Sequence, residues 1–159
     1  KNIVEHREKL GGYIEANQLL EVYAFDSDEF GSTVGGNLAA LAAGEALYEE
    51  GKYEEAIKYL KEFDGKGDEA IEAGATCMIG DCYVAKGDAK SAVKYFEKAG
   101  AIENDLTAPR ALNKAGIAYE SLGEWAKAEK CYQTIKDVYF NSQLAMEMDK
   151  RIERCKANQ

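Results

Sequence analysis

Glycines recur at a fixed interval along this chain. Gly44, Gly80 and Gly116 are 36 residues apart, and each is followed seven residues later by a second glycine. The second glycines are followed by an alanine and then by a large apolar side chain, in the order Gly51, Ala56, Leu60; Gly87, Ala92, Phe96; and Gly123, Ala128, Tyr132. Self-similarity at this period indicates three copies of one structural unit, stacked so that neighbours bury a shared core.

Each unit has the pattern of two helices joined by a tight turn. Thr76, Ile79, Gly80 and Tyr83 fall at i, i+3, i+4 and i+7, which predicts one buried face of a first helix. The other two units repeat this spacing with Ala40, Ala43, Gly44, Leu47 and with Leu112, Ala115, Gly116, Tyr119. A glycine inside a helix costs about 1 kcal/mol, so we expect another backbone to pack closely against it.

The second glycine of each pair is expected to end the first helix in the left-handed conformation. Asp88 or Glu124 then begins the next helix, and Pro109 suits the first turn of the third unit. A phosphate-binding loop would need Gly-Lys-Ser or Gly-Lys-Thr, and the sequence contains neither.

Composition excludes several classes of protein. The net charge of -9, from 20 basic and 29 acidic residues, opposes binding to nucleic acid or directly to an anionic membrane surface. Four cysteines without a CxxC pair, and a single histidine at position 6, do not make a zinc site, and we expect no cofactor. We expect Cys77, Cys82, Cys131 and Cys155 to be free and buried, because cysteine packs as a small hydrophobe.

The three cores GEALYEEGKYEEAIKYL, GDCYVAKGDAKSAVKYF and GIAYESLGEWAKAEKCY resemble the tetratricopeptide repeat (TPR) family. The leading tryptophan of the family pattern is replaced by Ala40, Thr76 and Leu112, and the period of 36 exceeds the usual one of about 34. The resemblance implies an all-α, right-handed solenoid of helical hairpins. We expect one structural domain, with repeats over 37–72, 73–108 and 109–140.

Helical segments are also predicted on both sides of the repeats. Residues 1–36 are expected to form one or two N-terminal helices that pack on the first repeat. Residues 141–159 carry an apolar stripe of Leu144, Met148, Ile152 and Cys155, which predicts a helix that shields the last repeat from water.

In such a solenoid the first helix of each hairpin lines an inner wall that is available to ligands. The predicted protein-binding groove consists of Leu38, Leu41, Glu45, Tyr48, Cys77, Asp81, Val84, Arg110, Asn113, Ile117 and Glu120. TPR proteins with a carboxylate clamp use paired lysines and asparagines, whereas this wall offers Arg110 and Asn113 against three acids. We therefore expect a basic or apolar protein or peptide partner.

Catalysis is not expected from this inventory. Glu45 and Asp81 are the nearest approach to a carboxylate pair, and an open groove does not give them the enclosed, water-excluding surroundings of a catalytic site. The interpretation is a non-catalytic, monomeric scaffold. A cytoplasmic adaptor and a self-assembly module remain as alternatives.

The order of segments, with three long repeats ending in Tyr-Phe-Asn-Ser and a short cap, also resembles bacterial envelope TPR proteins of the YfgM-like kind. This resemblance implies an N-terminal membrane anchor, an exported periplasmic domain and partners among secretion-channel or chaperone components. The start at Lys1 instead of methionine agrees with removal of such an anchor.

Overall fold

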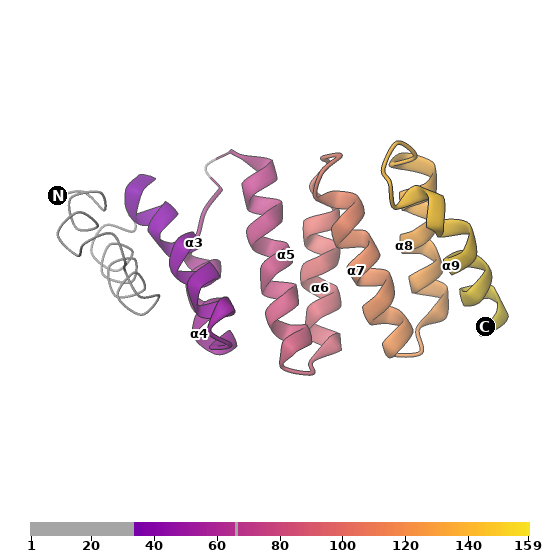
Figure 1. The fold of residues 1–159 in the computed structure, drawn as a ribbon, viewed down its shortest axis with the longest axis horizontal. Coiled ribbons are helices and arrows are strands. Elements are labelled where there is room, and N and C mark those ends of the chain that lie inside the picture. Colours follow the sequence, from indigo (N-terminus) through magenta and orange to yellow (C-terminus); the bar gives the residue numbers. More distant parts are fainter. Residues whose placement is uncertain (1–33, 66) are drawn as a thin grey trace. The chain divides into compact units, whose positions relative to one another are not determined.

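The computed structural model describes residues 34–65 and 67–159 (Figure 1). This part of the chain consists of helices joined by turns and loops and contains no strand. Its helices are α3 (Val34–Glu49), α4 (Tyr53–Glu62), α5 (Glu69–Ala85), α6 (Ala89–Gly100), α7 (Ala108–Ser121), α8 (Trp125–Val138) and α9 (Ala145–Ala157). The all-α helical-repeat fold is confirmed. Residues 1–33 of the N-terminal region 1–36, in which one or two helices were expected, lie outside the described residues.

The described residues belong to two compact units that divide between Asp64 and Gly65. The first contains the hairpin of α3 and α4. The second contains the hairpins of α5 with α6 and α7 with α8, and each helix from α5 to α9 packs against the next along the chain. The second unit therefore holds two whole repeats and the terminal helix.

Helix α5 begins before the expected repeat boundary at residue 73. The Asp68 side chain accepts a hydrogen bond from the Ile71 backbone nitrogen at 3.1 Å and so caps the helix at Glu69. Asp88 caps α6 in the same way through the Ser91 nitrogen at 3.0 Å, as predicted. Pro109 lies in the first turn of α7, which was also predicted.

The first glycine of each pair is a packing site, with a different neighbour from the one expected. A Cβ on Gly80 would lie 2.5 Å from Phe96 Cε1, and one on Gly116 would lie 2.4 Å from Tyr132 Cε1. At Gly44 the closest atom is Leu60 Cγ, at 2.6 Å. The prediction of a close backbone was wrong for Gly80 and Gly116, where the aromatic side chain of the second helix occupies the space. At Gly44 the Leu60 backbone nitrogen also lies close, at 3.3 Å.

The second glycines have the predicted left-handed conformation. Their φ angles are 76° at Gly51, 76° at Gly87 and 71° at Gly123. At each one the chain turns from the first helix of a hairpin into the second.

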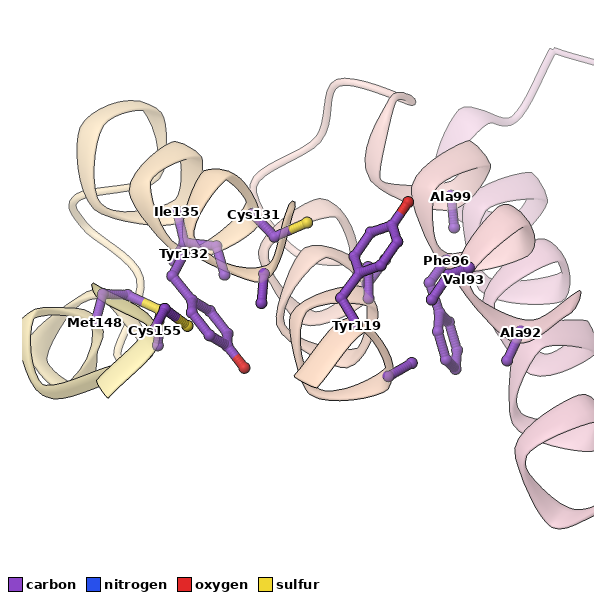
Figure 2. Packing of buried hydrophobic residues seen from close by; sticks show 14 of the residues in the cluster. Ala92, Val93, Phe96, Ala99, Tyr119, Cys131, Tyr132, Ile135, Met148 and Cys155 are labelled. Carbon is purple, nitrogen blue, oxygen red and sulfur yellow. The ribbon is translucent and has the colours of Figure 1, made fainter. Parts of the chain in front are cut away.

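The core of the second unit runs from Cys77 of α5 to α9, and Figure 2 shows part of it. Phe96 and Tyr132 are almost fully buried, and Met148 and Cys155 of α9 face Tyr132. Ile152 is also buried, so α9 covers α8 as the apolar stripe predicted. Capping by the C-terminal helix is thus confirmed.

Candidate binding site

A hollow of about 400 Å³ opens between α5, α6 and α7. Its lining consists of Asp81, Val84, Gly87, Ala89, Phe96, Lys114, Ile117, Ala118 and Ser121. The first helices of two successive repeats supply most of this lining. Asp81 and Ile117, which are 36 residues apart, occupy equivalent positions on these two helices.

Apolar side chains dominate the hollow. Val84 and Ile117 are 51% and 45% exposed, which is high for branched aliphatic residues, whereas Phe96 is only 1% exposed. Because Phe96 also fills the space beside Gly80, the same ring belongs to the hairpin packing and to the lining of the hollow.

One ion pair crosses the hollow between α5 and α7. Lys114 Nζ lies 2.6 Å and 2.8 Å from the two carboxylate oxygens of Asp81, and 5.8 Å from the centre of the Phe96 ring. Both side chains of the pair remain partly exposed. The acid expected to face a partner is therefore neutralised by a lysine of the next repeat.

The other predicted wall residues of the second unit have different surroundings. Cys77 is 7% exposed, so its side chain packs in the core and is not an accessible wall residue. Burial raises the pKa of its thiol. Arg110 lines a separate hollow with Asp105, Leu106 and the segment 142–144.

Glu120 and Asn113 are engaged differently again. Glu120 Oε1 accepts a hydrogen bond from the Tyr132 hydroxyl at 2.7 Å, and its carboxylate pairs with Arg154 of α9 at 2.6 Å. It is therefore held by the terminal helix. The Asn113 Oδ1 atom is buried and has no hydrogen-bond partner among the described residues.

The predicted wall residues of the first unit all lie on α3. Leu38 is 48% exposed, Glu45 is exposed, and Leu41 and Tyr48 are partly buried. The Tyr48 and Tyr53 rings are 5.7 Å apart between centroids, which places Tyr48 against the start of α4.

Six residues that line the α5–α7 hollow were missed by the sequence argument, namely Gly87, Ala89, Phe96, Lys114, Ala118 and Ser121. Lys114 lies one residue beyond Asn113, and a wall drawn from strict helical spacing omitted it. The sequence did contain a clue to Lys114, because it lies 33 residues after Asp81. Residues separated by nearly one period of 36 lie on the first helices of neighbouring repeats.

Residues 38–64, 73–105 and 111–138 each match the tetratricopeptide repeat. Together the three matches make up more than half of the chain, and they coincide with the three hairpins described above. The chain is a tetratricopeptide-repeat protein. Its hollow thus lies between the first helices of its second and third TPR repeats.

Several solved structures have the same fold as this TPR protein. Nearly identical TPR-like repeats of a Podosopora anserina kinesin light chain superpose with a TM-score of 0.71 at 13% identity, covering 97% of this chain and 82% of that one. MamA superposes with a TM-score of 0.57 at 19% identity, over 99% and 95% of the two chains. The Yersinia enterocolitica type III secretion translocator chaperone SycD gives 0.52 at 18%, over 92% and 88%. No curated protein matches this TPR sequence.

TPR repeats form a protein-binding scaffold that is generally non-catalytic. In the described part of this TPR protein, no three His, Cys, Asp or Glu side chains come together as a metal site would require. None of the described helices combines the length and the apolar character needed to cross a membrane.

The cysteines of the TPR core are buried, as predicted. Burial raises the pKa of both Cys82 and Cys131 to about 11. At neutral pH these side chains are thiols, and the thiolate is the nucleophilic form of cysteine.

Proposed function

We propose that this TPR protein is a non-catalytic scaffold that holds a peptide, or an extended segment of a protein partner, in the α5–α7 hollow. One observation carries the proposal: Val84 and Ile117 remain about half exposed on either side of a hollow of about 400 Å³. Apolar surface left open around a concave site is typical of a binding groove.

An apolar side chain of the partner is the best occupant of this hollow. Covering apolar surface contributes roughly 25 cal/mol per Å², so an inserted aliphatic or aromatic side chain gains by contact with Val84 and Ile117. Phe96, which is only 1% exposed, closes the base of the hollow. A few well-packed side chains of this kind, inserted by one partner into a pocket of the other, carry most of the binding energy in protein interfaces.

The ion pair of Asp81 with Lys114 refines the expected partner. A basic group of the partner could pair with Asp81 only by competing with Lys114. An acidic group could pair with Lys114 only by competing with Asp81. Charge thus offers little net affinity here, and an apolar residue flanked by uncharged polar residues fits best.

Selection from a displayed random-peptide library tests the proposal. We expect wild-type protein to enrich peptides with a common apolar residue, and Ile117→Asp to lose them by more than tenfold in affinity. Val138→Asp is the matched control, since Val138 is 60% exposed and does not line the hollow. Equal loss in both variants, or no enrichment by the wild type, would refute the α5–α7 site.

A more specific cellular role is supported by the order of segments in the sequence alone. We propose that the domain is exported on an N-terminal anchor and assists a secretion-channel or chaperone partner; a cytoplasmic adaptor is the alternative. Alkaline phosphatase fused after Gln159 of the full-length gene product distinguishes them, because the reporter is active only in the periplasm. An inactive fusion that is nevertheless expressed would contradict export.

A further inference from the structure

A further hollow, of about 560 Å³, is formed by α6, α7 and α8. We call it the α6–α8 trough, and its lining consists of Glu97, Gly100, Ala101, Leu112, Tyr119, Lys127, Lys130, Cys131 and Thr134. It shares no residue with the α5–α7 hollow.

Lysines line the trough on α8, and further lysines lie on the exposed side of α6. On α6, Lys90, Lys94 and Lys98 are exposed and follow one another at intervals of four residues, so they form one stripe along the helix. Glu97 and Ala101 lie two helical turns after Lys90 and Lys94, so these lysines share the side of α6 that carries the two trough residues. On α8, the exposed Lys127 and Lys130 line the trough directly.

Most of these ammonium groups are available. Lys127 pairs with Glu124 at 2.5 Å and lies 5.3 Å from the centre of the Tyr119 ring. Among the residues that the structure describes, the ion pairs include none to Lys90, Lys94, Lys98 or Lys130. The acid inside the trough, Glu97, accepts the Tyr119 hydroxyl hydrogen bond at 2.7 Å.

The floor of the trough is apolar and partly aromatic. Tyr119 is 5% exposed and Cys131 is 6% exposed, while Leu112 is only partly buried. A ligand can therefore gain from an apolar side chain at the centre and from negative charges at both edges.

We propose that the α6–α8 trough is a second docking surface, which binds an acidic segment of a partner protein through an apolar residue flanked by carboxylates. Five lysines against Glu97, Glu124 and Asp88, whose carboxylate lies near Lys94, leave this surface positive in a chain whose net charge is -9. A short acidic segment contacts only these lysines. DNA or an anionic lipid surface extends beyond them and meets the repulsion of the negatively charged protein.

Fluorescence anisotropy with labelled peptides tests this surface. The probe is a peptide with glutamates on both sides of one leucine, and the control peptide has lysines in place of the glutamates. We expect wild-type protein to bind the glutamate probe, more weakly as salt rises, and not the lysine peptide. Failure to bind the glutamate probe, or equal binding of both peptides, would overturn the proposal.

Charge-matched variants locate the binding. Lys94→Glu with Lys130→Glu should weaken binding of the glutamate probe by about tenfold or more. Lys58→Glu with Lys150→Glu makes the same change in net charge outside the trough and should leave the affinity nearly unchanged. Equal weakening in the two variants would show a general charge effect and would reject the trough. Circular dichroism on both variants verifies that the fold is retained.

Two further comparisons separate the proposal from its alternatives. Exchanging the leucine of the probe for alanine should reduce affinity, and an unchanged affinity would remove the apolar floor from the mechanism. Binding of a DNA duplex or of phosphatidylglycerol vesicles that is lost in the Lys94 and Lys130 variant would replace the peptide with that polyanion. Because Ile117→Asp should leave the glutamate probe bound, failure at the α5–α7 hollow and failure at the trough are distinguishable.

Discussion

The ring of Phe96 occupies the place that a side chain on residue 80 would need. Its Cε1 and Cδ1 atoms lie 2.5 Å and 2.6 Å from the position of a Cβ on Gly80. Phe96 is 1% exposed, so the ring is held by its neighbours and has little room to move.

Gly80→Ala should therefore destabilise the protein, although alanine is the better helix former. We expect overpacking to cost about 1–3 kcal/mol and to outweigh the helix-propensity gain of about 0.5–1 kcal/mol. Urea denaturation measures the change. Gly74→Ala in the same helix is the control: nothing lies within 4 Å of its Cβ position, so this variant should be slightly more stable. Similar gains in both variants would disprove the packing role of Gly80.

The left-handed turn at Gly123 should tolerate asparagine better than a branched residue. Its φ of 71° strains a residue with a Cβ, while nothing lies within 4 Å of that Cβ position. Gly123→Val should cost about 1–2 kcal/mol or more through backbone strain alone. Gly123→Asn should cost less, because asparagine enters this conformation more readily. Thermal unfolding that ranked asparagine below valine would contradict this explanation.

The Tyr132 hydroxyl depends on Glu120 as its hydrogen-bond acceptor. Because the Tyr132 side chain is fully buried, Glu120→Ala should cost about 1–3 kcal/mol by leaving the hydroxyl proton without its acceptor. Adding Tyr132→Phe removes the unpaired group and should recover part of the loss. A double-mutant cycle in denaturant measures the coupling, and strictly additive effects would show that the hydrogen bond does not matter.

Stability should fall in alkali because two core thiols resist ionisation. Burial raises the pKa of Cys82 and of Cys131 from 9.0 to about 11, so the unfolded chain loses these protons first as pH rises. Their contribution is complete below pH 9.0 and is lost between 9.0 and about 11. The Cys82→Ala and Cys131→Ala double variant should show a shallower decline of unfolding free energy across that range. Parallel pH profiles would rule out the thiols as its cause.

The repeat architecture was predictable because the period acts on many residues at once. The packing of Gly80 against Phe96 and the positive φ of Gly87 have counterparts in the other two repeats, so the sequence shows each pattern three times. The close neighbour of Gly80 was misjudged, since helix propensity shows that space is needed and does not show which atoms fill it.

The candidate site was less predictable, because it depends on contacts that differ between repeats. Helical spacing located Asp81, Val84 and Ile117 in one hollow, but an ion pair between neighbouring repeats neutralises Asp81. Glu120 fits the same spacing and is held instead by Arg154, a residue outside the repeats. Side-chain partners of this kind are not encoded in the period.

The contacts between the third repeat and α9 also limit how such a protein can lengthen by duplication of its repeats. The Glu120 and Tyr132 pair belongs to the third repeat, but its cationic neighbours Arg151 and Arg154 belong to α9. One repeat length of 36 residues before them, the chain has Ala115 and Ala118. A tandem copy of the third repeat would place these alanines where the arginines now lie and would leave an acid without its counterion. New repeats are thus expected to be accepted upstream of the third one, which keeps its place as the last.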